Sequence, residues 1–346
     1  MIAGEAEGDG SQLTLQRVLH PDALPAAWDE LASSYFQRRA FLRHAHTYNP
    51  CRQRYYLLRD GDTVQAGAVV YSLRMDMLTF LGLPSPVMMH IAGVPCSVSS
   101  GGLLGDSRHY PQLLTRLRSA EVGLLLCLNL DACPVTVNMV QGRTLPTIVL
   151  NNPFRSWGEY RDALRATYRR RLRSIEAAAD SLTITNLPCS TYNADMHGLY
   201  EQVYQRSRDK LERLTADFFR HLPAEFHLTV LQSGERLLGW TICLLDDERW
   251  YFVLGGRSYA PDILPDLYFV MLLTVLKQGI AAGARQIDFG QTAEIPKMRL
   301  GGIPREKYML GAHSNPLWHT LLRWGGGLLS NRRVTPAAHV FKDGQR

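Results

Sequence analysis

The chain has 346 residues, of which 46% are hydrophobic and 20% charged, and this composition excludes an intrinsically disordered protein. Its length allows two domains of ordinary size, each with its own core. The net charge of +6 and the pI near 9.0 favour an anionic partner.

The six cysteines are scattered, without a C-x-x-C pair or a histidine at metal-ligand spacing, so the sequence predicts neither a bound metal nor a disulfide framework. The first residues, MIAGEAEGDGSQ, lack the basic and apolar segments of a signal peptide, which predicts a cytoplasmic protein. Residues 1–11 are expected to be a flexible N-terminus. Prolines interrupt the long uncharged stretch 77–105, so no membrane span is expected.

The first half of the chain predicts a hairpin, a helix and a strand. The segment RYYLLRDGDTVQAGAVVYSL, residues 54–73, has two apolar runs separated by a turn at residues 60–62. An amphipathic pattern follows over about 107–120, and then a buried strand.

A helix is expected in the middle of the chain, over residues 157–180. Ser156 and Glu159 form a capping box that places its start at Trp157. The apolar residues of this segment share one face: Trp157, Tyr160, Leu164, Tyr168, Leu172 and Ile175. The opposite face is basic, with Arg165, Arg169, Arg170, Arg171 and Arg173, and no acidic residue lies between residues 163 and 175. This face is either solvated or a phosphate-binding surface, and the pattern favours neither.

The second half repeats the order of the first. Residues 226–254 predict three strands joined by turns, an apolar helix is expected over about 265–282, and a strand ends at Asp288. The recurrence of hairpin, helix and strand indicates two copies of one α/β unit.

These elements resemble the acetyltransferase fold called GNAT. A tandem pair of such units, joined through SWGEYRDALRATYRRRLRSIE and closing on IDFGQTAEIPKMRLGG, resembles the FemAB-like and BioF2-like acyltransferases. The resemblance implies an α/β fold with mixed sheets and two tandem GNAT-like domains. Lys297 occupies the position of the lysine in that group's substrate turn, whereas Pro296 stands where the group usually has an aromatic residue. The R/Q-x-x-G-x-G/A pyrophosphate loop of single-domain GNAT enzymes is absent from the sequence.

The expected boundaries follow from this pattern. Residues 12–147 are expected to form the first GNAT-like domain and residues 148–315 the second, which contains the arginine-rich helix. Residues 316–346 are expected to form a C-terminal helix and a basic tail.

The resemblance places the candidate site in the second domain. Lys297 is expected to hold a phosphate or a developing oxyanion beside a glycine turn, with Asp288 at a strand end and Glu294 as the other catalytic candidates. Lys297 is otherwise a surface lysine, and Asp288 is otherwise a cap for the turn at Gly290. The candidate residues for binding donor or substrate are Arg169, Arg170, Arg173, Arg299, Tyr268 and Gly301.

The reaction implied by the resemblance is N-acyl transfer from a thioester, carried by coenzyme A or an acyl carrier protein, to a small-molecule or peptide amine. No tightly bound cofactor is expected. The alternative is a FemAB-type transferase that forms peptide bonds from aminoacyl-tRNA, because both kinds of donor carry phosphates that the arginines would bind. A second alternative is a non-catalytic anion-binding protein on the same scaffold.

Overall fold

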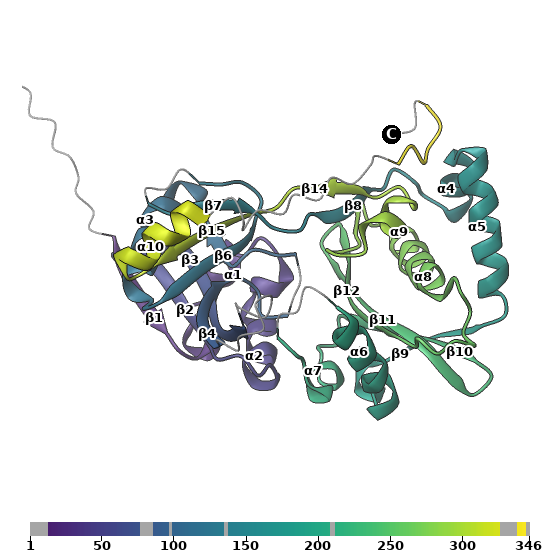
Figure 1. Cartoon of the computed structure of the whole chain (residues 1–346), viewed down its shortest axis with the longest axis horizontal. Helices are drawn as coiled ribbons and strands as arrows, with labels where there is room; N and C mark the ends of the chain where they lie inside the picture. Colours follow the sequence, from purple (N-terminus) through teal and green to yellow (C-terminus); the bar gives the residue numbers. More distant parts are fainter. Residues whose placement is uncertain are drawn as a thin grey trace, which may run out of the picture.

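The computed structural model describes residues 13–76, 86–96, 99–134, 138–207, 212–325 and 338–343. Two mixed β-sheets lie side by side and helices cover both of them (Figure 1). The expected N-terminal segment 1–11 lies outside the described residues, as do residues 326–337 and 344–346 of the expected basic tail.

The first sheet contains the expected hairpin of residues 54–73, with the turn at residues 60–62. Its strand order is β1 (Thr14–Val18), β2 (Gln53–Asp60), β3 (Thr63–Asp76), β4 (Pro86–Ala92), β6 (Leu124–Leu130), β15 (Tyr308–His313) and β7 (Val140–Arg143), and β5 (Leu103–Gly105) pairs with β3. Strands β4 and β6 are parallel, and all other pairs are antiparallel.

The second sheet repeats this arrangement. Its order is β9 (Thr183–Leu187), β10 (Phe226–Ser233), β11 (Arg236–Asp246), β12 (Arg249–Arg257), β13 (Gln286–Asp288), β8 (Thr147–Asn151) and β14 (Ile303–Arg305). Again one pair is parallel, β12 with β13, and it flanks a helical crossover. The internal repeat is therefore present in the sheet topology, and the expected strands 226–254 and the strand ending at Asp288 are confirmed.

The two sheets exchange one strand each. Strand β8 follows the first unit in sequence but pairs with β13 and β14 in the second sheet. Strand β15 follows the second unit but lies between β6 and β7 in the first sheet. The expected boundary at residue 315 is therefore wrong for residues 308–313, because their backbone hydrogen bonds complete the first sheet.

The helices pack on both faces of each sheet. They are α1 (Ala27–Leu31), α2 (Arg39–Tyr48), α3 (Tyr110–Ala120), α4 (Trp157–Ala163), α5 (Ala166–Ala179), α6 (Ala194–Arg206), α7 (Ala216–Arg220), α8 (Leu267–Ala281), α9 (Glu294–Met298) and α10 (Pro316–Gly325). Helices α4, α5 and α8 share one core with the second sheet, and α6 and α7 share another on its opposite face. None of the described helices has the length and hydropathy of a bilayer-spanning segment.

The arginine-rich helix begins at Trp157 as expected, but it is two helices. The Ser156 hydroxyl accepts a hydrogen bond from the Glu159 N–H, which confirms the cap. Leu164 then adopts an extended conformation and forms a β-bridge with Phe341, while the Arg165 N–H donates to the Val340 carbonyl. Backbone pairing with the C-terminal segment thus replaces the helical hydrogen bonds at this point.

The two domains also share a hydrophobic core. Tyr35 and Phe36, from the first half of the chain, pack edge to face against Phe226 and Tyr251 of the second sheet. The Tyr35 N–H also donates to the buried carboxylate of Asp246 at 2.7 Å. Apolar burial and a buried polar contact therefore join the domains.

Candidate functional site

The parallel strands of the second sheet separate after a short pairing. Strand β13 ends at Asp288, opposite Tyr251, whereas β12 continues to Arg257. No strand among the described residues pairs with this edge of β12 beyond Tyr251. Because the Ser258 N–H bonds to β11 at Leu238, strand alternation turns the backbone groups of Gly255 and Arg257 toward the open edge.

The first domain lacks this opening. There, β4 pairs with β6 up to Ala92, which is the last residue of β4. The next residue, Gly93, forms an isolated antiparallel β-bridge with Gly101. The open strand edge is therefore a feature of the second domain.

A polar cleft of about 610 Å³ lies between the domains, on the face of the second sheet opposite α8. Its lining contains four acidic and three basic side chains. These are Asp131, Asp246, Asp247, Glu248, Arg249, Arg285 and Lys307. The remaining lining is mostly hydroxyl, amide and phenol groups: Ser33, Ser34, Ser99, Ser100, Asn151, Tyr251 and Gln286, with Gly101. The cleft has the size of a small-molecule site and a highly polar surface.

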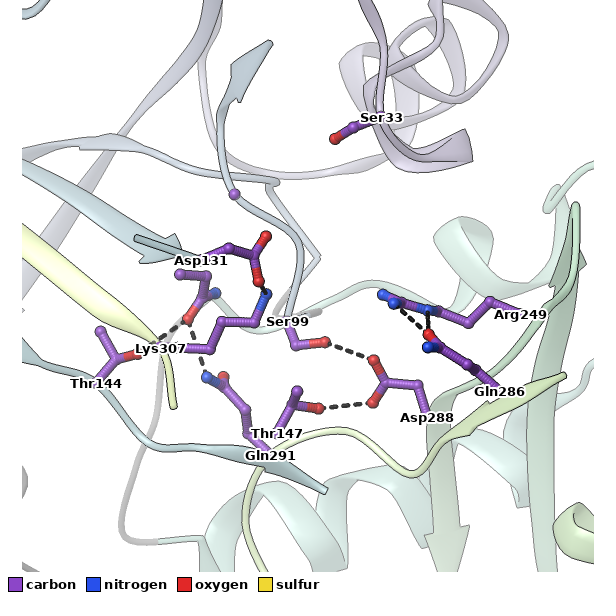
Figure 2. A network of polar contacts seen from close by, with 12 residues as sticks. Ser33, Ser99, Asp131, Thr144, Thr147, Arg249, Gln286, Asp288, Gln291 and Lys307 are labelled. Carbon is purple, nitrogen blue, oxygen red and sulfur yellow. Dashed lines mark hydrogen bonds and ion pairs between the residues drawn. The ribbon is translucent and has the colours of Figure 1, made fainter. Parts of the chain in front are cut away.

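Asp288 joins the elements near this cleft (Figure 2). Its buried carboxylate accepts hydrogen bonds from the Thr147 hydroxyl at 2.6 Å, the Gly290 N–H at 2.8 Å and the Ser99 hydroxyl at 3.3 Å. The Gly290 bond is the turn cap that the sequence offers as the alternative role of Asp288. Ser99 belongs to the first domain, so the carboxylate also connects the two domains.

Two cations of the cleft are held by polar partners. The Lys307 ammonium donates to the exposed carboxylate of Asp131 at 2.6 Å (Figure 2). The Arg249 guanidinium donates through Nε to the Gln286 side chain at 2.9 Å. Burial raises the pKa of Tyr251, at the same wall, to about 12.

Lys297 is buried and lies in the short helix α9. Its ammonium donates to the carbonyls of Gly290 and Gln291, at 3.1 and 2.6 Å, just after the end of β13. Burial lowers its pKa to about 7, and the negative charges of Asp288 and Glu294 oppose this shift. The three catalytic candidates of the sequence are therefore close enough to interact, around one loop.

Arginines gather at the start of α8, on the other face of the second sheet. The Arg171 guanidinium stacks on Phe269, and that of Arg257 lies over the ring of Tyr268. Arg299 lines the same small surface pocket as Arg171 and Phe269. A helix N-terminus surrounded by arginines is suited to bind a phosphate.

The other candidate residues are more dispersed. Arg170 and Arg173 are exposed on α5, whereas the Arg169 guanidinium donates to the Leu164 carbonyl at the break between α4 and α5. Gly301 has a φ of +89°, and a Cβ there would meet the ring of Phe341 at 2.4 Å. Arg169 therefore contacts the backbone of its own chain at Leu164, and Gly301 lies against the ring of Phe341.

Sequence reasoning did not identify several of these groups. Arg249 and Lys307 in the cleft and Arg257 at the start of α8 were not candidates, nor was Ser99 on the first domain. Strand alternation places Arg249 and Tyr251 on one face of β12 and is a signal that the sequence does contain. Contacts between Ser99 and Asp288 depend on the docking of the two domains, for which the sequence has no local signal.

The fold consists of two similar α/β domains, and the second one has an open strand edge. Residues 162–298 match the family model described as acetyltransferase (GNAT) domain. Over these residues the match agrees with the resemblance to the GNAT fold.

The chain also matches solved structures at low sequence identity. One is a tandem GNAT protein from the clavulanic acid biosynthesis pathway, with a TM-score of 0.51 and 11% identity, covering 88% of this chain and 99% of that one. FemX has a TM-score of 0.48 and 12% identity, covering 79% and 90% of the two chains. L-PGS from Bacillus licheniformis has a TM-score of 0.48 and 11% identity, covering 80% and 89%. No curated protein matches the sequence. The tandem GNAT fold is thus confirmed by the first of these structures.

Proposed function

We propose that the protein is an N-acyltransferase that moves an acyl group from a thioester donor to an amine. The observation that carries this proposal is the open edge of β12. It lies between the arginines at the start of α8 and the polar cleft on the opposite face of the sheet. A donor bound through this opening would present its carbonyl to an acceptor in the cleft.

The open edge fits the arm of a thioester donor. The arm that carries the thiol of coenzyme A or of a carrier protein contains amide groups, which can pair with an exposed strand as an added strand does. The backbone groups of Gly255 and Arg257 would pair with these amides. The phosphates of the donor would then lie by the N-terminus of α8, where Arg171, Arg257 and Arg299 supply positive charge.

The cleft fits an amine acceptor. Its lining has one more acidic than basic side chain although the whole chain has a net charge of +6, so a cationic amine is drawn to it. The amine must lose a proton before it attacks the donor carbonyl. Lys297 lies at the loop that follows β13, and burial lowers its pKa to about 7, so it exchanges a proton around neutral pH. The negative charges of Asp288 and Glu294 oppose this lowering. We assign Lys297 the role of positioning the loop at Gly290 and Gln291, on which the shape of the opening depends.

The experiment measures acyl transfer with a panel of acyl coenzyme A thioesters and amines, with the acylated amine detected by mass spectrometry. Arg257→Ala and Arg171→Ala should each raise KM for the donor about tenfold and leave kcat within about threefold. Loss of one charge-assisted contact to a phosphate amounts to about 1.4 kcal/mol. Arg155→Ala is the matched control, because Arg155 is exposed and lies outside this site. Unchanged donor KM in both site variants contradicts the donor site.

Aminoacyl-tRNA is the alternative donor, and the exposed Arg170 and Arg173 on α5 favour it because they extend the basic surface beyond the start of α8. Binding of bulk tRNA that weakens steeply between low and moderate salt would support this branch. Binding of coenzyme A without any acylated product from either donor would support a non-catalytic anion-binding protein.

A further inference from the structure

Helix α10 presents an apolar face to solvent. Leu317, Trp318, Leu321 and Trp324 are 76%, 61%, 52% and 82% exposed. At 100° per residue these positions fall in an arc of about 120°. A tryptophan with four fifths of its surface exposed is unusual in a folded protein, and here two tryptophans and two leucines are exposed together.

The helix is nevertheless fixed to the first domain. His319 is buried, and Leu322 packs near Gly311 of β15. Just before the helix, Ser314 and Gly123 exchange two hydrogen bonds, from Gly123 N–H to the Ser314 hydroxyl and from Ser314 N–H to the Gly123 carbonyl. Val122, which is 80% exposed, directly precedes Gly123. The apolar face is therefore held outward by its packing.

The surroundings of this face are basic. Helix α10 itself contains Arg323 and no acidic residue. Burial lowers the pKa of His319, and the positive charges of Arg118 on α3 and Arg323 on α10 lower it further, which places both charges near His319. Arg116 is exposed on α3, and α3 contains no acidic residue. The two helices therefore carry arginines and no acidic residue.

We propose that α10 docks the protein on an anionic lipid bilayer. Helices that lie in a membrane interface combine an apolar face that contains tryptophan or leucine with lysine or arginine beside it. Arg323 on α10 and the arginines Arg116 and Arg118 on α3 complement anionic headgroups. The first sheet lies between α10 and the second domain, so docking leaves the polar cleft accessible (Figure 1).

Sedimentation with vesicles tests this proposal. The full-length protein should sediment with vesicles of phosphatidylcholine and phosphatidylglycerol at low salt. It should bind at least tenfold more weakly to pure phosphatidylcholine. Light emission from Trp318 and Trp324 should shift to shorter wavelength on binding and be quenched by brominated lipids. Of the other four tryptophans, Trp28, Trp240 and Trp250 are buried, and the half-buried Trp157 packs on the core of the second domain.

Two variants separate the apolar and the charged contributions. Leu317→Ser combined with Trp324→Ser should weaken vesicle binding at least tenfold, whereas Leu19→Ser, at an apolar side chain 60% exposed on another edge of the first sheet, should not. Arg323→Glu should weaken it several-fold, with Arg155→Glu as the matched charge reversal. Transfer between soluble substrates should be unaffected by these variants, because none of the substituted residues lines the polar cleft or the pocket beside α8, so the outcome is independent of the proposed function.

Three results overturn the proposal. The first is wild-type protein that stays in the supernatant with anionic vesicles, and the second is a double variant that sediments as wild type does. The third is a dimer in solution that dissociates in the double variant, with no vesicle binding, since α10 would then contact a second copy of the chain.

Discussion

Lys297 shows how a residue recognised in a sequence acquires its properties from the fold. Its place in the motif IPKMRLGG drew attention to it, but the motif suggests an exposed turn. In the structure the side chain is buried within α9 and its ammonium bonds to two loop carbonyls. Burial disfavours the charged form, so the pKa falls to about 7. The sequence identified the residue, whereas its burial depends on how α9 packs below the loop.

The lowered pKa predicts how stability depends on pH. The unfolded chain binds a proton at Lys297 up to about pH 10.5, whereas the folded protein releases it near pH 7. Between these values the unfolded state binds more protons, so the free energy of unfolding rises with pH by up to about 1.4 kcal/mol per pH unit from this group. Urea unfolding from pH 7 to 10 should show this slope in wild type and its loss in Lys297→Met. Lys277→Met, at a lysine 41% exposed, is the control. Equal slopes in wild type and Lys297→Met contradict the assignment.

At the scale of elements, local patterns predicted what local sequence determines. The hairpins, the caps and the helix before each parallel strand were predictable, because residue spacing and turn chemistry act within about twenty residues. The exchange of β8 and β15 was not predictable, because each of these strands pairs with strands from the other half of the chain. The same holds for the break at Leu164, where the partner is the distant Phe341.

The role of Gly301 also depends on a distant partner, and a substitution can test it. It was a candidate for donor binding, but its φ of +89° and the ring of Phe341 give it a role in seating the C-terminal segment. Gly301→Ala should lower the free energy of unfolding by about 1–3 kcal/mol, because a Cβ strains the backbone there and meets the ring. The control Gly198→Ala lies within α6 with open space around its Cβ, so it should stabilise by up to about 1 kcal/mol. Urea unfolding compares the two variants, and a stable Gly301→Ala with a raised donor KM favours the original assignment.

At the scale of the whole molecule, the two domains are expected to unfold together. The exchanged strands complete each sheet with backbone from the other half, and one hydrophobic core contains side chains of both. Phe36 lies at its centre, fully buried, with its ring centroid 5.3 Å from that of Tyr251. Separation of the domains therefore exposes both a core and two incomplete sheets.

Calorimetry of the full chain tests this coupling. Wild type should show one transition whose calorimetric and van't Hoff enthalpies agree. Phe36→Ala removes a fully buried ring and should cost about 3–5 kcal/mol, lowering the single transition as a whole. Leu117→Ala, also fully buried but within the core of the first domain alone, should likewise move one undivided transition. Two resolved transitions in wild type, of which Leu117→Ala moves only one, would show that the shared core and exchanged strands do not bind the domains into one cooperative unit.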